Sequence, residues 1–188
     1  MRRLAGTLIL VALAACRSDG VTVIPRQNLP GDVYGSPLPQ PTATVRLPEA
    51  ATVYLVEDGR LRPVSRPLSG EARSLPAALL FALLIPAEEG ARVHSAIPAD
   101  STVNSVTVAG SLATVDLSAE FEIGGSVRSQ AMRVAQVVYT LTEPATGTGI
   151  TSVQITIEGE EGVPGDSGEL LLTPVTRRNF DDFAPRRG

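Results

Sequence analysis

The 188-residue sequence contains no tryptophan, no lysine, one histidine and one cysteine, and only 4% of its residues are aromatic. With one cysteine, Cys16, the chain cannot form an intramolecular disulfide or a cysteine zinc site. With one histidine, His94, a multi-histidine metal site is excluded. Few aromatic side chains also disfavour a sugar-binding platform, because sugar rings stack on such surfaces. We therefore expect no metal and no cofactor.

The chain has slightly more acidic than basic residues. There are 16 basic residues, all arginines, and 20 acidic residues, which gives a formal net charge of −4. The charge becomes −6 if Arg2 and Arg3 leave with a leader peptide. A negative protein body repels polyanions, so we expect no nucleic-acid partner. The apolar content of 43% predicts one folded domain rather than a wholly disordered chain.

The first 16 residues have the layout of an export signal. Two arginines precede an apolar run over 8–15, and small residues stand immediately before Cys16. The run is too short to span a bilayer of about 30 Å as a helix rising about 1.5 Å per residue. It therefore predicts a secretory signal peptide over 1–15. An ordinary secreted protein with a chance cysteine is the alternative.

The residues Leu13-Ala14-Ala15-Cys16 resemble the lipobox of bacterial lipoproteins, in which the leader is cut before the cysteine and the thiol is acylated with diacylglycerol. The resemblance implies that Cys16 begins the mature chain and is the lipid attachment site. Each buried CH₂ group contributes about 0.8 kcal/mol, so two or three acyl chains, palmitate among them, would hold the protein stably. We expect a lipid anchor on the extracellular face of the cell membrane.

A proline-rich stretch follows the cysteine. Between 17 and 50 the chain has six prolines and three glycines, without a sustained helical or strand period. Such a segment buries too little surface to order itself, so 16–50 is predicted to be a flexible tether with a reach on the order of 30 Å. The other interpretation is that Val33-Tyr34 or the PLPQP run binds a partner.

From about residue 51 the hydrophobic pattern becomes regular. It predicts, in order, a strand over 52–57, an Asp58-Gly59 turn, an edge strand over 60–66, a helix capped by Ser74 and stopped by Pro86, an extended segment over 92–97, a β-hairpin over 103–117, a helix over 126–141 and a strand over 150–157. An acidic loop over 160–168 and a last strand over 169–174 follow. The order β-β-α-β-β-α-β, with two helices on one face of a mixed sheet, is an α+β fold in one domain over 51–183, before a disordered tail over 184–188.

The hairpin and the second predicted helix show the clearest patterns. Ala109-Gly110 is the expected turn of the hairpin. We expect the apolar stripe of the helix to cover the hairpin, and Arg128 and Arg133 on its other face to be solvated. The stripe consists of Val127, Ala131, Val134, Ala135, Val138 and Leu141.

The first predicted helix is apolar on nearly every side. That pattern predicts a helix covered on two sides. Phe81 and Leu84 are candidates for an additional contact surface, although a satellite core is the simpler interpretation.

Several of these segments together resemble the GerMN domain, which is named after the spore germination and sporulation protein GerM and occurs in many actinobacterial lipoproteins. They are VYL at 53–55, DG at 58–59, PVSR at 63–66, SAIP at 95–98, ATVDLS at 113–118 and QVVYTL at 136–141. The resemblance covers about 51–180. It implies a non-enzymatic, envelope-associated domain with a fold like the small βα modules of ring or scaffold assemblies. The chain departs from the family pattern at 85–90 and in the longer loop EPATGTG at 143–149.

One short motif resembles a protease site. Gly165-Asp166-Ser167-Gly168 matches the loop around the nucleophile of chymotrypsin-like proteases, and His94 and Asp100 or Asp116 lie upstream in the required order. However, Glu169 replaces the usual second glycine, and two helices occupy chain that two β-barrels would need. We interpret the motif as a polar surface turn, and we expect His94 to be half-buried in a strand.

Asp116 and Glu120 are the remaining candidates for chemistry. Two neighbouring carboxyl groups can act as a general acid and base. Paired surface carboxylates beside a loop are far more common, so we predict no catalytic residue.

The leading hypothesis is a lipid-anchored, non-enzymatic envelope module that binds an envelope protein or a cell-wall polymer through its sheet edge or a helix face. One alternative is a carbohydrate hydrolase of the envelope that uses Asp116 or Glu120. Another is a modulator of a membrane sensor kinase, which some lipoproteins with this domain resemble. The sequence leaves the oligomeric state open.

Overall fold

The computed structural model describes residues 47–68, 72–165, 167–172 and 174–186. The predicted signal peptide, Cys16 and nearly all of the predicted tether lie outside these residues. The elements are, in order, β1 (Ala50–Glu57), β2 (Arg60–Pro67), α1 (Leu75–Leu84), β3 (Val103–Ala109), β4 (Leu112–Leu117), the 3₁₀ helix η2 (Ala119–Glu122), α2 (Val127–Leu141), η3 (Pro144–Thr146), β5 (Ser152–Ile157), β6 (Glu160–Glu161), β7 (Val163–Pro164), β8 (Leu170–Leu171) and η4 (Arg177–Phe183). None of the helices in the described residues has the length and hydropathy needed to cross a bilayer.

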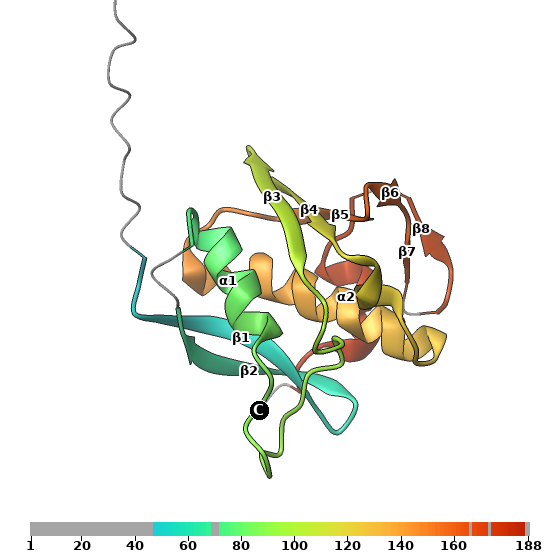
Figure 1. Ribbon diagram of the computed structural model, residues 1–188, viewed down its shortest axis with the longest axis horizontal. Helices are drawn as coiled ribbons and strands as arrows, with labels where there is room; N and C mark the ends of the chain where they lie inside the picture. Colours follow the sequence, from blue (N-terminus) through green and yellow to red (C-terminus); the bar gives the residue numbers. More distant parts are fainter. Residues whose placement is uncertain (1–46, 69–71, 166, 173, 187–188) are drawn as a thin grey trace, which may run out of the picture. The chain divides into compact units, whose positions relative to one another are not determined.

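The α+β fold and the mixed sheet are confirmed (Figure 1). Four strands form a sheet in the order β3-β4-β5-β6, in which β4 and β5 are parallel and the other pairs are antiparallel. The structure adds that β1 and β2 form a separate two-stranded sheet and that β7 and β8 form a third. Part of the predicted acidic loop over 160–168 therefore belongs to short strands, and the predicted last strand is only two residues long.

The two hairpin turns follow from glycine chemistry. In the first, Asp58 and Gly59 have φ angles of 51° and 71°, the left-handed pair that a type I′ turn requires. In the second, Ala109 pairs with Leu112, so the turn is Gly110-Ser111 rather than the predicted Ala109-Gly110. The shift has a simple reason, because Gly110 at φ 61° takes the first turn position and leaves Ala109 in the strand.

The second predicted helix, α2, is the centre of the domain. The Ser126 hydroxyl accepts a hydrogen bond from the Ser129 amide, which confirms the predicted cap. Val127 is wrongly placed in the buried stripe: it is the first residue of the helix and is 52% exposed. Every residue over 131–141 is buried, because α2 packs against β1, α1, η4 and β7 as well as the mixed sheet. Figure 1 shows α2 crossing the middle of the domain.

The first helix, α1, lies beside α2 and β1. The Ala77 amide donates to the Ser74 hydroxyl at 3.3 Å, as the sequence predicts. Five of its residues are buried, namely Ala78, Leu79, Leu80, Ala82 and Leu83. Phe81 remains 43% exposed, and Ile85, immediately after the helix, is 53% exposed. The helix is thus covered on two sides and leaves an apolar strip on its surface.

Candidate functional site

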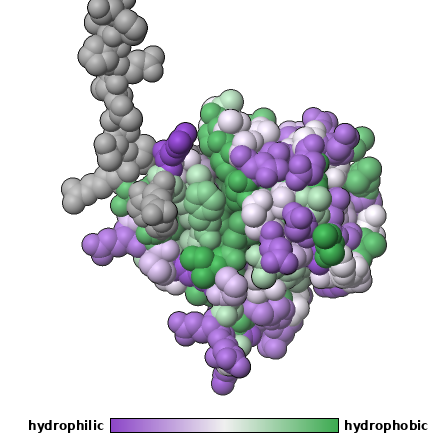
Figure 2. All heavy atoms as spheres, in the orientation of Figure 1, coloured by the Kyte–Doolittle hydropathy of each residue, from purple (hydrophilic) through white to green (hydrophobic). Residues whose placement is uncertain are grey.

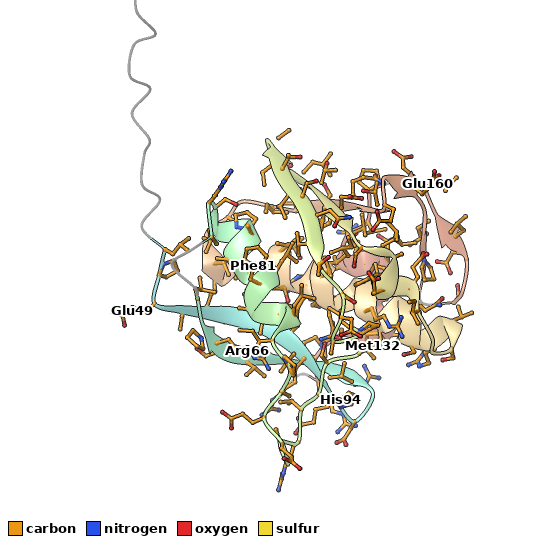
Figure 3. All side chains as sticks on the ribbon, in the orientation of Figure 1. Glu49, Arg66, Phe81, His94, Met132 and Glu160 are labelled. Carbon is orange, nitrogen blue, oxygen red and sulfur yellow. The ribbon has the colours of Figure 1, made fainter. Side chains whose placement is uncertain are left out.

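The protease-like motif forms a surface turn over its described residues. Ser167 is exposed and its hydroxyl donates to Oε2 of Glu169 at 2.5 Å, while Asp166 lies outside the described residues. His94 is exposed rather than half-buried, because only its backbone is engaged, in a two-bond bridge with Val56. Glu160 lies at the start of the segment that carries the motif, and Figure 3 shows His94 far from it. The structure therefore does not assemble a serine protease site from these residues.

Asp116 is held by its own chain. Its Oδ1 accepts hydrogen bonds from the Thr156 hydroxyl at 2.7 Å and the Gly159 amide at 2.8 Å, and its Oδ2 accepts one from the Asn104 amide at 3.1 Å. The hydrogen bond from Thr156, followed by the bond from Gly159, holds the pKa of Asp116 below its ordinary value. Asp116 thus fastens the turn between β5 and β6, where Glu158 has a positive φ of 50°.

Glu120 lies in η2 and belongs to a different local arrangement. A hydrogen bond from the Ser118 side chain lowers its pKa. Asp116 and Glu120 share no hydrogen-bond partner in the described residues, so the structure does not join them into an acid–base pair. Over the same residues, no group of three or more histidine, cysteine or acidic side chains is placed to hold a metal ion.

Arg133 corrects a prediction. It is 4% exposed rather than solvated, because its guanidinium caps the turn that wraps over the start of α2. It donates to four carbonyl oxygens at 2.7–3.1 Å, those of Ala96, Phe121, Ile123 and Gly124. Burial lowers its pKa. Helical period alone missed this role because the four acceptors come from segments that the period does not describe. Arg128 is exposed as predicted, and its guanidinium carbon stacks 4.6 Å from the centre of the Phe183 ring.

Two polar side chains of α2 form hydrogen bonds with the backbone of β1 along its free edge. The Tyr54 amide donates to the Thr140 hydroxyl at 3.0 Å, and the Gln136 side-chain amide donates to the Tyr54 carbonyl at 2.9 Å. The Ala96 amide donates to Oε1 of Gln136 at 2.8 Å. Gln136 and Thr140 are fully buried. These bonds explain why the segment QVVYTL at 136–141 carries polar residues in the middle of the core.

A further polar cluster joins β1, α2, the loop after α2 and η4. The Tyr54 hydroxyl donates to Oε2 of Glu143, and Nη2 of Arg177 contacts the same oxygen at 2.9 Å. Arg177 also donates to the Thr142 hydroxyl at 2.9 Å and the Tyr139 carbonyl at 2.8 Å. Its guanidinium carbon lies 4.7 Å from the Tyr139 ring centre and 5.3 Å from that of Tyr54. We call Tyr54, Tyr139, Glu143 and Arg177 the Tyr–Glu–Arg cluster.

The charges of this cluster are fixed by their surroundings. Burial, together with the hydrogen bond to Glu143, raises the pKa of Tyr54 to about 12. Burial also pushes the pKa of Glu143 upward, but the hydrogen bonds from Tyr54, Arg177 and Ala145 outweigh it and the pKa is lowered. At neutral pH Tyr54 is therefore neutral and Glu143 is a carboxylate paired with Arg177. Such a cluster holds chain segments together and is poorly suited to proton transfer near pH 7.

A pocket of about 750 Å³ opens beside the Tyr–Glu–Arg cluster. The loop after α2 forms one wall and the start of η4 forms the other, with Glu143, Arg177 and the exposed Arg178 among its lining residues. Gly147 and Gly149, each with φ near 70°, give the loop its course. The loop is longer than the family pattern, but its sequence does not predict a pocket. The only signal for it was the run of proline and glycine.

Comparison with known protein families shows to which family the chain belongs. A family model described as "Germane: Sporulation and spore germination" matches residues 33–163, which is more than half of the chain. The chain belongs to the Germane family. Its match begins ahead of the described residues and ends at the first residue of β7. A search of curated proteins found no match to this Germane protein.

Solved structures show the same fold. The first GerMN domain of the sporulation protein GerM from Bacillus subtilis is 24% identical, with a TM-score of 0.54 over 69% of this chain and 98% of that chain. The tandem GerMN domains of the same protein are 23% identical, with a TM-score of 0.55 over 69% of this chain and 46% of that chain. The Germane protein thus spans about half the length of the tandem structure. The likenesses confirm the GerMN fold that the sequence resemblance implied.

Proposed function

We propose that this Germane protein is a lipid-anchored, extracytoplasmic binding module of the cell envelope that performs no chemistry on its partner. The observation that carries the proposal is the state of Asp116, the leading candidate for acid–base work. Both of its oxygens are occupied by donors of the same chain. A general acid or base must present its carboxyl group to a substrate, whereas this group fastens a turn.

The pocket beside the Tyr–Glu–Arg cluster supports binding rather than turnover. It combines apolar walls with the exposed guanidinium of Arg178, while Glu143 is already paired with Arg177. A site of this kind suits a polar segment of an envelope protein or the stem of a cell-wall polymer that carries a carboxylate. The family description concerns sporulation and spore germination, and it supports a role at the envelope.

The anchor is proposed from the leader sequence, since Cys16 lies outside the described residues. The test is cell fractionation of the full chain and of Cys16→Ser. We expect the wild-type protein in the membrane fraction and Cys16→Ser in the soluble exported fraction. Mass spectrometry of the wild-type protein should find acyl chains on Cys16. An unmodified thiol on the exported protein would contradict the anchor.

The absence of chemistry is tested separately with purified cell-wall sacculi. We expect no soluble fragments to be released, whether or not the protein sediments with the sacculi. Arg178→Glu should reduce any sedimentation, and Arg186→Glu, an exposed arginine outside the pocket lining, is the matched control. Fragment release that disappears in Asp116→Asn or Glu120→Gln would establish the hydrolase instead.

A further inference from the structure

Over the described residues, no second strand pairs with the outer backbone edge of β3. This strand is the first in the order β3-β4-β5-β6, and only β4 pairs with it in the described residues. An uncovered edge strand presents N–H and C=O groups that can pair with another strand. Natural sheets therefore block such edges with proline, charge, a short length or a covering segment. The other strand edges of the described residues each have at least one of these four features.

The other edges are covered, blocked or very short. The free edge of β1 is occupied by the side chains of Gln136 and Thr140 and by the backbone of His94. The outer edge of β5 is covered by β6 and by a backbone bridge between Val153 and Val175. The strands β6, β7 and β8 have two residues each.

The edge of β2 is blocked by its composition. It carries Pro63, which lacks a backbone donor, and three arginines, Arg60, Arg62 and Arg66. Both proline and positive charge discourage the approach of a further strand.

The edge of β3 has neither proline nor charge, and in the described residues α1 contacts the strand without forming a hydrogen bond to its edge. Its sequence, VNSVTVA, contains no proline and no charged residue over seven positions. Its residues are exposed apart from the half-buried Val103 and Val106, and Val108 is 45% exposed. Figure 1 shows the end of the β3–β4 hairpin projecting from the body of the domain. Figure 2 shows a hydrophobic surface over α1 and along the neighbouring β3.

The turn of the hairpin determines which backbone groups point outward. In a hairpin with a two-residue turn, the residues that flank the turn form a hydrogen-bonded pair, and hydrogen-bonded and non-hydrogen-bonded pairs then alternate. Ala109 and Thr107 therefore bond to β4, opposite Leu112 and Thr114. Val106 and Val108 direct their N–H and C=O groups away from β4.

We propose that this edge is the interface between two copies of the chain, which pair β3 with β3 in antiparallel orientation. The outward residues of one strand must bond to outward residues of the other, and the register that pairs both outward valines of each copy places Val106 opposite Val108 of the partner. Thr107 then lies on the two-fold axis and faces Thr107 of the second copy. The pairing joins two four-stranded sheets into one of eight strands and places each exposed Val108 beside an apolar neighbour.

Charge favours a second copy in this orientation. The strand itself is neutral, so pairing it with itself brings no like charges together within β3. The acidic residues nearest to it, Asp116 and Glu158, lie at its Asn104 end, where both are bonded to the Asn104 side chain. The opposite end is the uncharged turn Gly110-Ser111. Antiparallel pairing places each acidic end beside the uncharged turn of the other copy, whereas parallel pairing would bring the acidic ends together.

Disulfide trapping tests the pairing and its register. The full chain is produced with Cys16→Ser, so that each introduced cysteine is the only one. Directly opposed residues in a non-hydrogen-bonded pair have Cα atoms about 4.5 Å apart, which suits a disulfide. We expect Thr107→Cys to form a covalent dimer readily under mild oxidation. Ala109→Cys, an exposed position two residues away, is the matched control and should form at least about tenfold less dimer with itself, because its two copies lie about 13 Å apart in this register.

A mixture checks the register, since Ser105 faces Ala109 of the second copy. Ser105→Cys and Ala109→Cys together should form mixed dimers in preference to either self-dimer. Equal trapping of Thr107→Cys and Ala109→Cys would show random collision and overturn the proposal.

Sedimentation of unmodified protein supplies an independent readout. Val108→Pro removes an outward N–H without removing a bond to β4, so it should shift the wild-type dimer to monomer while the circular dichroism spectrum is retained. Thr114→Val, in the inner strand β4, should leave the dimer unchanged. A wild-type chain that is monomeric at about 1 mM would overturn self-pairing and leave the edge to a strand of another protein.

Discussion

The side-chain amide of Gln136 donates a hydrogen bond to the backbone carbonyl oxygen of Tyr54 at 2.9 Å, across 82 residues of sequence. The same side chain accepts a bond from the Ala96 amide, so one residue joins α2 to β1 and to the segment before β3. Because Gln136 is fully buried and Tyr54 is buried with it, the Tyr54 carbonyl has no water to replace its bond, whereas the Ala96 amide is partly buried. The core of this domain is thus organised by polar contacts as well as by apolar packing.

Gln136→Leu should destabilise the domain by about 2–4 kcal/mol, since it leaves the buried Tyr54 C=O and the partly buried Ala96 N–H without partners, and a fully buried group in that state costs about 1–3 kcal/mol. Urea unfolding followed by circular dichroism measures the change. Gln130→Leu on the same helix is the control, and it should cost less than about 1 kcal/mol because its single bond to the Glu122 carbonyl is at an exposed site. Equal effects of the two variants would contradict the role assigned to Gln136.

Arg133→Lys should cost about 2–4 kcal/mol although the charge is retained. The planar guanidinium reaches four carbonyl oxygens, and an ammonium group with three donors cannot reproduce that fork. Thermal unfolding of the purified variant is the measurement. Arg128→Lys, at an exposed position of the same helix, should change the stability by less than about 1 kcal/mol.

Val138→Asp should prevent stable folding, with a loss of more than about 4 kcal/mol, because it places an unpaired carboxylate in a fully buried site. Val127→Asp is the informative comparison, since the hydrophobic period assigns both valines to one stripe. Val127 is 52% exposed at the start of α2, so that variant should fold with nearly wild-type stability. A cooperative melt of Val138→Asp at the wild-type temperature would contradict the position of α2.

The stability should fall in acid partly through Glu143. Its pKa in the folded protein is lowered, so its contribution is present above its ordinary pKa of 4.5 and is lost as the pH falls through the lower folded value. Glu143→Gln should therefore be less stable than wild type at pH 7, and the difference should shrink below about pH 4. Chemical unfolding at several pH values measures it. Glu160→Gln, at an exposed position, should match wild type at pH 7. A difference for Glu143→Gln that grows in acid would have the wrong sign.

Local chemistry was readable in advance where neighbouring residues decide the outcome. Ser74 and Ser126 cap their helices as expected because an N-cap bond spans only three residues. The prediction of the Asp58-Gly59 turn is correct because these two residue types tolerate the positive φ that the turn requires. The resemblance to the GerMN domain extended this local information to the whole fold, which the solved structures confirm.

Apart from the one-residue shift of the hairpin turn to Gly110-Ser111, the failures involve residues whose environment comes from other segments of the chain. The helical period predicts a solvated Arg133 because the period carries no information about the four carbonyl acceptors. It predicts a buried Val127 because it contains no information about where the helix leaves the core. The Tyr–Glu–Arg cluster was not foreseen, since Tyr54, Glu143 and Arg177 are separated by 89 and 34 residues.

The sequence by itself determined the helices, the hairpins and the order of the elements, because caps, turns and hydrophobic periods act between residues that are close along the chain. It also carries the lipobox-like leader from which the anchor is proposed. Only the tertiary structure decided which polar side chains complete the core, which carboxylates are already occupied, and which strand edge remains uncovered. Those properties depend on what lies opposite each group in space, and burial makes every unpaired polar group costly enough to fix its partner.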